Sequence, residues 1–372
     1  MKKSVRTLVI VTLSLGLLWL FLRGAHLDQV WAEIKQADAW WMTLSVVTTV
    51  GNMVIRAVRW QYLLAPIGHA RFRPAFRTTM IGFAASTVLP ARAGEIIRPY
   101  LLARQEGLNG TATFATVVVE RLLDGATVLL FLAVFVLFFS QQMAAGNALY
   151  HAVRVGGLAV GAGTLVILGL MFFAAKDPQA IGRWAFKLEH LLPGRFTHML
   201  AEILQRFAEG LAVVRSPMRL MTALALSLPL WLSIALGIWL VTIAFHIDMP
   251  FPGSFLIVAL LIVGVAVPTP GAVGGFHYFY RLGTTIFFAA PNDRAVGAAI
   301  VLHAVSFVPV AIVGLTSFFA VPNDRAVGAA LMLHASSVIP TLGLGFLFLI
   351  QDGLDFGSMQ KLATAAAEGE SR

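Results

Sequence analysis

Charged side chains interrupt long apolar stretches of this chain, where lipid would reject an unpaired charge. Arg56 and Arg59 lie three residues apart near the end of one such stretch, so they share a face of a helix. Two interpretations are open. The arginines extend to the cytoplasmic headgroups, beside Trp60 as an interfacial aromatic residue, or they bind a lipid phosphate from below. Arginine suits the second role because its planar fork matches phosphate oxygens with two hydrogen bonds.

A second group of charged residues combines both signs. Glu95 and Arg98 are three residues apart, and a later apolar run contains Glu120, Arg121 and Asp124. Ion pairs such as Glu95–Arg121 or Arg98–Asp124 would satisfy these charges. The pairs would form either a purely structural network or a site for a charged headgroup. We expect these five side chains to line one cavity.

Two breaks rich in proline and glycine lie beside these residues, within 84–99 and 263–277. The residues that break the helices are Pro90 and Gly94 in the first, and Pro268, Pro270, Gly271 and Gly274 in the second. Proline removes a backbone donor and glycine weakens a helix, so each segment should break inside the membrane. Paired breaks in the two halves of a chain point to a transporter's binding site. His277 follows the second break and is a candidate contact for that reason, although a histidine there is more often a packed bundle residue.

The composition requires a membrane protein. Of the 372 residues, 58% are apolar and 12% are charged, and the mean hydropathy is +0.82. A soluble chain could not cover so much apolar surface with polar groups. Runs long enough to span a bilayer lie at roughly 5–22, 42–64, 113–139, 153–174, 218–246, 295–318 and 326–350. Together with the shorter broken segments, these runs predict an all-α, polytopic membrane protein with about seven to nine spans.

The sequence predicts one transmembrane domain over 1–350, followed by a polar tail at 351–372. Its largest polar insert, 178–214, contains apolar residues at helical spacing and is predicted to form an amphipathic helix on the cytoplasmic surface. A second, shorter interfacial helix is predicted between the first two spans. The residues of its apolar face are Leu27, Val30, Trp31, Ile34 and Ala37.

Basic residues set the predicted orientation. Lys2 and Lys3 place the N-terminus in the cytoplasm, and the basic insert 178–214 should lie there too. By this count the first broken segment, 75–100, starts and ends on the cytoplasmic side and must be re-entrant. The second broken segment, 253–289, begins on the outer side. One break entering from each face is the geometry of an inverted-topology repeat.

A tandem duplication is visible near the end of the chain. Residues 287–299 recur as 318–330, and His303 recurs as His334, with a period of 31 residues. We predict that 287–348 contains two copies of one helix and its loop, and that the extra helix is peripheral. One additional span changes the side on which the C-terminus emerges.

Several classes of function are not expected. The chain has no cysteine, and its nine histidines lack the spacing of metal ligands, so we expect no metal and no cofactor. The net charge is +9, and most of the basic residues flank the apolar runs. This pattern favours binding to anionic lipid over binding to nucleic acid. The sequence contains no nucleotide-binding or nucleophile motif, and we expect no enzymatic activity.

These motifs together resemble the lysylphosphatidylglycerol synthase transmembrane family, flippase-like integral membrane proteins of bacteria. The matching pieces are Arg56 with Arg59 and Trp60, residues 89–98, Glu120 to Asp124, and residues 268–274. The resemblance implies a protein of the bacterial inner membrane that moves lipids or lipid-linked headgroups between leaflets. Family members fused to a soluble aminoacyl-transfer domain also make lysyl-lipid, and we expect that catalytic half to be absent here. The chain departs from the family at His277, where a glutamate is expected, and in its duplication.

Three functions are therefore open. The first is a translocator of phospholipids, with anionic or phosphate-bearing headgroups as partners. The second is a membrane-embedded transferase acting on a lipid-linked substrate, with Glu95, Glu120 or Asp124 as its base. The third is a non-catalytic partner of a separately encoded lipid-modifying enzyme. Breaks that enter from opposite faces favour the translocator, because an enzyme needs a cavity open to one side.

Overall fold

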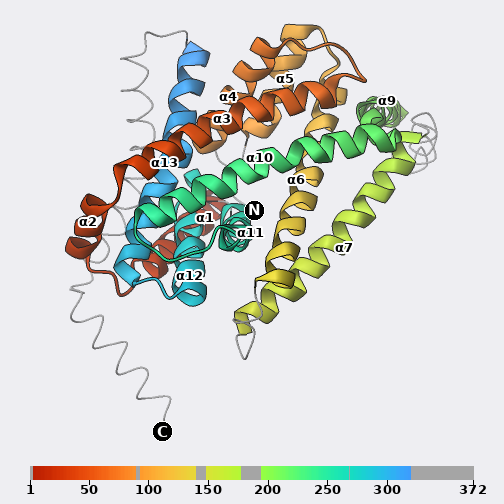
Figure 1. Cartoon of the computed structure of the whole chain (residues 1–372). Helices are drawn as coiled ribbons and strands as arrows, with labels where there is room; N and C mark the ends of the chain where they lie inside the picture. The colour runs from red at the N-terminus through yellow and green to blue at the C-terminus, as the bar shows by residue number, and fades with distance from the viewer. Residues whose placement is uncertain (1–2, 89–92, 140–147, 177–193, 268, 320–372) are drawn as a thin grey trace.

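The computed structural model describes residues 3–88, 93–139, 148–176, 194–267 and 269–319, which form helices and no strand. The helices are α1 (Lys3–Leu22), α2 (Leu27–Gln36), α3 (Ala39–Leu64), α4 (Phe72–Val88), α5 (Gly94–Glu106), α6 (Gly110–Phe138), α7 (Ala148–Lys176), α9 (Gly194–Gly210), α10 (Pro217–Ala244), α11 (Gly253–Ala266), α12 (Gly275–Phe288) and α13 (Asn292–Phe319), with short 3₁₀ turns η3 (Ala212–Arg215) and η4 (Pro270–Ala272). Figure 1 shows their arrangement.

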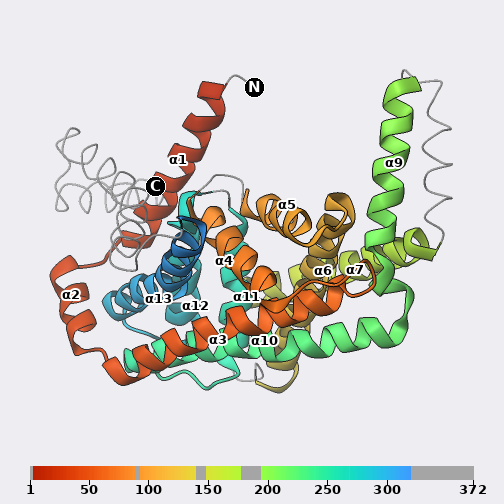
Figure 2. The same cartoon turned by 90° about the horizontal axis from the view of Figure 1, so that it is seen from above.

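Five of these helices are long and apolar enough to cross a membrane: α3, α6, α10, α13 and the part of α7 from Val155 to Phe173. They coincide with five of the predicted spans. The predicted span 5–22 forms α1, which packs on α12 through the buried Leu18 and Phe21 and otherwise projects from the bundle (Figure 2). The predicted span 326–350, the second copy of the duplication and the tail 351–372 lie outside the described residues.

The long helices α3 and α10 pack antiparallel along their lengths (Figure 1). The Asn52 side chain donates to the Leu230 carbonyl at 2.8 Å, and the Asp38 amide donates to the Ala244 carbonyl at 2.9 Å. This pairing defines two ends of the bundle. The basic end holds the C-terminus of α3 and the N-termini of α6 and α10, with the exposed Arg71, Arg104 and Arg215 nearby. The far end holds the N-termini of α3 and α13.

Side-chain caps fix where the helices at these ends begin. Asp38 accepts a hydrogen bond from the Trp40 amide at 2.8 Å at the start of α3, and Asn109 accepts one from the Ala112 amide at 3.0 Å at the start of α6. Ser216 caps α10, which has Pro217 in its first turn. The caps accept hydrogen bonds from backbone N–H groups at the helix ends, which lipid chains could not do.

The first predicted break is a helical hairpin, α4 and α5, whose two ends both lie at the basic end. Arg71 and Glu106 join its base, with 3.2 Å between Nη2 and Oε1. The two helices cross where Gly82 faces Gly94, so closely that a methyl group on Gly94 would overlap the Gly82 carbonyl oxygen. The predicted segment 75–100 therefore forms a hairpin, and its re-entrance into the membrane stays a prediction; Pro90 lies outside the described residues.

The second break is also a hairpin, α11 and α12, and it enters from the far end (Figure 1). Its helices cross where Gly264 meets Gly275. Between them Gly271 has φ +59° and Gly274 has φ +87°, backbone conformations that favour glycine. The His303 ring lies 2.8 Å from the Gly271 carbonyl oxygen, which the broken helix leaves without an intrahelical donor. The second hairpin contacts the first, because η4 packs on α4 beside Thr87.

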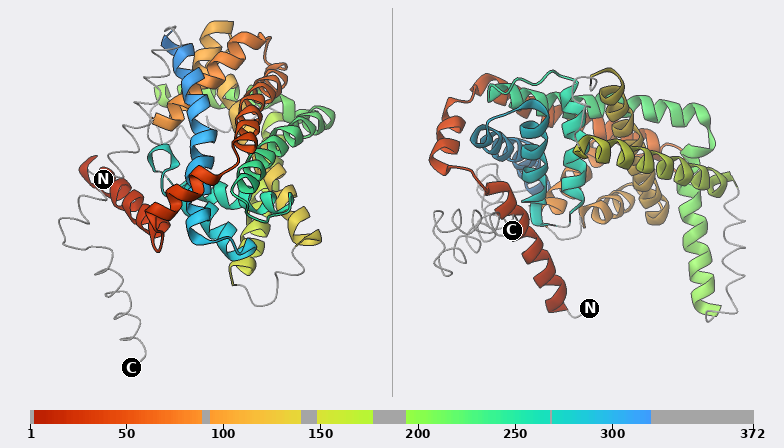
Figure 3. Two further views of the ribbon diagram at one scale, coloured as in Figure 1. Left: turned by 60° about the vertical axis from the view of Figure 1, so that its left-hand side comes forward. Right: turned by 90° about the horizontal axis from the view of Figure 1, so that it is seen from below.

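The two predicted surface helices are present as α2 and α9. On α2, Val30 is buried against α13, but Leu27 and Trp31 are 44% and 57% exposed, so the predicted apolar face is split between the bundle and the outside. The helix α9 packs on α6 and buries Ala208. Together α7 and α9 form the side of the molecule remote from α2, as Figure 2 and Figure 3 show.

Candidate functional site

Four arginines and two carboxylates from three helices meet inside the bundle. Glu120 is the centre of this arginine cluster. Its Oε1 lies 3.3 Å from Arg56 Nη1, 3.4 Å from Arg59 Nη2, 3.1 Å from Arg98 Nη1 and 2.6 Å from Arg121 Nη2. Asp124 is the second acid, 2.7 Å from Arg59 Nη1 and 3.4 Å from Arg121 Nη2.

Helical spacing brings these residues together. Arg56 and Arg59 face α6 from one side of α3, and Glu120 and Asp124 face α3 from one side of α6, since residues three or four apart share a helix face. Arg98 comes from α5, the returning helix of the first hairpin. The break at Gly94 therefore places a guanidinium beside acids that lie on a different helix.

Arg56 and Arg59 do not extend to the headgroups, as one of the two interpretations proposed. They are 4% and 0% exposed, and Trp60 is also completely buried. Both arginines instead pair with acids on α6. The interpretation of Trp60 as an interfacial residue is wrong, because the indole Nε1 donates to Thr116 Oγ1 at 3.0 Å inside the bundle.

The predicted ion pairs are right in one case and wrong in the other. Arg121 Nη1 lies 3.8 Å from Glu95 Oε1, as predicted. Arg98 pairs with Glu120 instead of Asp124, because its approach from α5 brings it to the first acid of the α6 face. Asp124 is engaged by Arg59 and by Trp231 Nε1, which donates to it at 2.9 Å.

The cluster keeps a net positive charge. Its four arginines face two buried acids and the partly exposed Glu95. Burying charges is costly unless partners and hydrogen bonds compensate. Several donors lack that compensation: within the described part of the chain, Arg56 Nε, Arg121 Nε, and Nε and Nη2 of Arg98 have no hydrogen-bond acceptor. An anion placed among them would supply both the charge and the acceptors.

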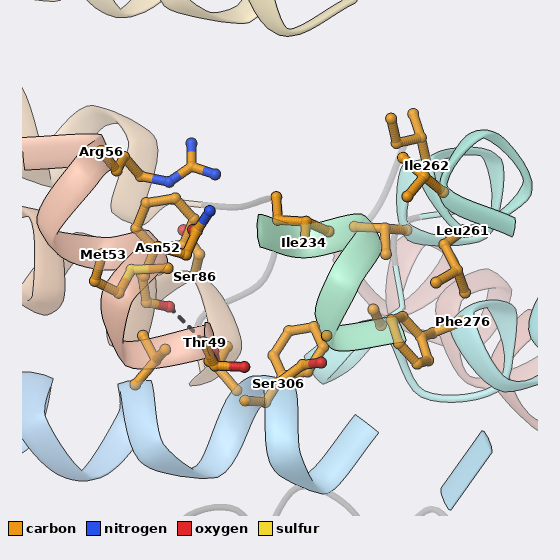
Figure 4. Close-up of a pocket in the computed structure, with 18 of the residues that line it drawn as sticks. Thr49, Asn52, Met53, Arg56, Ser86, Ile234, Leu261, Ile262, Phe276 and Ser306 are labelled. Atoms are coloured by element: carbon orange, nitrogen blue, oxygen red, sulfur yellow. Dashed lines mark hydrogen bonds between the residues drawn. The ribbon is translucent and has the colours of Figure 1, made fainter. Parts of the chain in front are cut away.

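A cavity of about 490 Å³ adjoins the cluster. Arg56, Arg98, Arg121 and Glu95 line it at the side of the cluster, whereas Arg59, Glu120 and Asp124 lie behind them. Its other walls include Ile234 of α10, Leu261 and Ile262 of α11, and Phe276 of α12. In Figure 4, Arg56 lies on the α3 side and these apolar side chains lie opposite. The cavity therefore joins a cationic region to an apolar one.

The remaining candidates are distributed around this cavity. Gly94 and Gly271 line it, while Pro270 and Gly274 belong to the tip of the second hairpin. Pro90 and Pro268 lie outside the described residues. His277 is 7% exposed and is not among the residues that line the cavity. Its ring packs 4.5 Å from that of His303 and 5.0 Å from that of Phe21, so the structure places it in the core between α1, α12 and α13.

Sequence reasoning missed the residues that hold the cluster from behind. Ser227 and Trp231 of α10 bind Arg59 and Asp124, and Thr116 fixes Trp60. A serine and a tryptophan four residues apart in an apolar helix carry no signal of their own. Their role follows from the packing of α10 on α3. The part of the chain that the structure describes contains no group of three or more His, Asp or Glu residues placed to hold a metal ion.

The helices and the cavity define a polytopic membrane protein with a cationic, partly apolar interior site. The family model for the lysylphosphatidylglycerol synthase transmembrane region matches residues 7–314. The chain belongs to this family.

The chain is similar to several archaeal proteins. The chain is 24% identical over 346 residues to the glycosyltransferase AglD of Haloferax volcanii, a match that covers 83% of this chain and 53% of AglD. It is 23% identical over 335 residues to a UPF0104 membrane protein of Pyrococcus horikoshii, covering 84% of this chain and 96% of that protein. A UPF0104 membrane protein of Methanothermobacter thermautotrophicus is 23% identical over 292 residues, covering 74% and 82%. The chain thus spans about half the length of AglD.

Proposed function

We propose that this protein is a lipid translocator, which moves a phospholipid or a lipid-linked headgroup between the two leaflets without a chemical step. The observation that supports this function is the set of unsatisfied guanidinium donors at the wall of a cavity that is otherwise largely apolar. Guanidinium groups bind phosphate with paired, charge-assisted hydrogen bonds. Apolar walls accommodate acyl or isoprenoid chains.

The two hairpins support movement from one leaflet to the other. They enter from opposite ends of the bundle, and η4 of the second contacts α4 of the first beside the cavity. Broken helices that meet near the middle of the membrane form the substrate sites of transporters built from inverted repeats. A site reached by one hairpin from each end can open alternately to each side.

The proposed location is the cytoplasmic membrane of a bacterium, with the N-terminus and the basic end in the cytoplasm. The exposed arginines at the basic end support this orientation, because cytoplasmic loops carry an excess of basic residues. The proposed partners are phospholipids with anionic or phosphate-bearing headgroups. A separately encoded lipid-modifying enzyme would be a further partner, supplying or consuming the lipid.

Reconstitution in liposomes tests this function. Vesicles that contain the purified protein and fluorescent phosphatidylglycerol should lose more signal to a membrane-impermeant quencher than protein-free vesicles do. An Arg98→Ala protein, inserted to the same level, should behave like empty vesicles. The assay is repeated with phospholipids of other headgroups. The proposal would be contradicted if quenching were equal with the wild-type protein, with the variant and without protein for every lipid.

A transferase acting on a lipid-linked substrate is the alternative, and the name of the relative AglD supports it. Two of the three candidate bases argue against it, because Glu120 and Asp124 lie behind the cavity wall and are held by several arginines, which leaves Glu95 as the acid that lines the cavity. Incubation of the protein with labelled lipid-linked sugar and a lipid acceptor separates the two functions. A new product that is lost in Glu95→Gln would favour the transferase, because Glu95 is the acid that lines the cavity. If the protein shows neither transfer nor lipid movement, that result would favour a non-catalytic partner.

A further inference from the structure

One face of α3 is polar between Arg56 and the far end. Its members are Ser45, Thr48, Thr49 and Asn52, at the spacing of one helix face, and all four line the cavity. From Ser45 to Arg56 this face is about 16 Å long at 1.5 Å per residue. That length is about half of the hydrocarbon thickness of a bilayer.

The other face of the same helix is apolar. Val47, Val50, Val54 and Val58 are 59%, 44%, 41% and 44% exposed on the outside of the bundle. The polar residues at the same depths are buried or half-buried and turned toward the cavity. The helix therefore separates a lipid-facing surface from an interior polar one.

Helix packing explains part of this polar face. Ser45 donates to the Gly237 carbonyl at 2.9 Å, and Asn52 bonds to Leu230 and Ser233, so both join α3 to α10. Thr48 and Thr49 are different. Their hydroxyls donate to the Ser45 carbonyl of their own helix, at 2.8 and 3.0 Å. Neither hydroxyl bonds to α10, although Thr48 packs beside Gly237 of that helix, so Thr49 is the one of the two that α10 packing leaves unexplained.

Hydroxyl groups from other helices also line the cavity. Ser86 of α4, Ser233 of α10 and Ser306 of α13 do so, and Figure 4 shows Ser86 and Ser306 on the same side as Thr49. Leu261 and Ile262 of α11 lie across from them. Hydroxyl groups thus gather on the α3 side of a largely apolar cavity, across from the apolar residues of α11, which suits a lipid headgroup and its chains.

We infer that the polar face of α3 is the path along which the headgroup passes between the arginine cluster and the far end. This inference rests on the proposed function. Uncharged hydroxyls suit a path because each can exchange its hydrogen bonds with a phosphate or with water, and none holds a phosphate as an arginine does. The same geometry assigns an anionic substrate. A cationic headgroup would meet three arginines of the cavity wall and one partly exposed acid, Glu95.

Single cysteines test the path without any transport assay. The chain has no cysteine, so Ser45→Cys, Thr49→Cys and Asn52→Cys can be compared with Val47→Cys, Val50→Cys and Val54→Cys on the other face. A thiol reacts as its thiolate, which requires water. A charged methanethiosulfonate added to reconstituted vesicles should therefore modify the polar-face thiols at least tenfold faster. The anionic sulfonatoethyl reagent should exceed the cationic trimethylammonium reagent at Asn52→Cys by roughly tenfold, because the arginines concentrate anions. Equal rates on both faces would overturn the path, whether or not the protein moves lipid.

A matched pair of threonine variants tests passage itself. The double variant Thr48→Val with Thr49→Val removes two hydroxyls that face the cavity and breaks no bond between helices. Thr43→Val makes the same change on the exposed side of α3, where the hydroxyl bonds to the Ala39 carbonyl at 2.8 Å. Phosphatidylglycerol movement should fall roughly tenfold in the double variant, as expected for losing one to two hydrogen bonds in transit, and stay unchanged in Thr43→Val. An unchanged rate in the double variant would overturn the inference while leaving the translocator function intact.

Discussion

The guanidinium of Arg98 lies over the ring of Trp60, with 3.7 Å between Cζ and the ring centroid. Thr116 fixes the ring from α6, and Glu120 holds Nη1 of the arginine at 3.1 Å. The cation–π contact and the ion pair together set the orientation of Arg98. Its Nε and Nη2 have no acceptor among the described residues, so the group is positioned in advance to receive an anion.

Replacing the Trp60 ring should weaken the binding of an anion by Arg98. Trp60→Leu removes the face on which Arg98 rests, and binding of dioctanoyl phosphatidylglycerol, measured by titration calorimetry, should weaken by roughly tenfold. Trp60→Phe should keep part of the affinity because it retains an aromatic face. Trp40→Leu, at a position 67% exposed on the same helix, is the control and should bind as the wild type does. Unaltered affinity in Trp60→Leu would show that the ring does not orient the arginine.

Alanine replacements of Arg98 and Arg59 should have different effects, the first on lipid movement and the second on stability. Arg98 lines the cavity, and Arg98→Ala leaves Glu120 paired with the other arginines, so the protein should fold but lose lipid movement. Arg98→Lys should recover part of the movement, since lysine lacks the planar fork. Arg59 lies behind the wall and holds Asp124 at 2.7 Å, so Arg59→Ala should cost about 3–5 kcal/mol of stability. Thermal unfolding and quenching assays on the same preparations measure both effects. Loss of folding in Arg98→Ala would indicate a purely structural network.

The pair of Glu95 and Arg121 offers a test that keeps the net charge. Replacing both by glutamine also removes the contact of Arg121 Nη2 with Glu120 at 2.6 Å, but Arg56, Arg59 and Arg98 still neutralise that acid, so the protein should fold. Lipid movement should still fall, because Arg121 lines the cavity with an unsatisfied Nε. Wild-type movement in the double variant would exclude headgroup binding by Arg121.

The glycine crossings should be intolerant of a single methyl group. Gly275→Ala would bring its Cβ into the Gly264 carbonyl and separate α11 from α12, so the melting temperature should fall. Gly51→Ala on α3 has no neighbouring atom within 4 Å, and should keep or raise the melting temperature because alanine favours a helix. A Gly275→Ala protein as stable as Gly51→Ala would contradict the close crossing.

The first hairpin can be tested by labelling from each side of the membrane. Cysteines placed at Arg71 and Arg104 should both react with an impermeant maleimide from the cytoplasm, because both positions lie at the base of the hairpin. Permeabilised cells provide the control for accessibility. Labelling of the two positions from opposite sides would mean that α4 and α5 cross the membrane once between them.

Much of the fold could be predicted from local pattern. Apolar length predicts α3, α6, α7, α10 and α13, and the prolines and glycines predict where the two hairpins turn. The partners of Arg56 and Arg59 could not be predicted, because they depend on the crossing of α3 with α6. An arginine near the end of a span can be explained locally, by extension of its side chain to the headgroups. Here tertiary packing buries both arginines instead.

The prediction for α2 shows a related limit. Helical spacing places Leu27, Val30 and Trp31 on one face, and a surface helix needs nothing more. Docking against α13 rotates the helix so that Val30 is buried and Trp31 is not. Periodicity identifies an apolar side but not how much of it a neighbouring helix will cover.

The order of the cluster residues along the chain has a consequence for biosynthesis. Arg56 and Arg59 are made before Glu120 and Asp124, so α3 enters the membrane without its counter-ions. Each guanidinium at the middle of a bilayer costs about 2.5–3.5 kcal/mol during insertion. We therefore expect the C-terminal turns of α3 to stay near the aqueous boundary until α6 is translated. On this expectation, completion of the bundle is coupled to neutralisation of these arginines, and the last part of α3 should reach its final depth after α6 has been inserted.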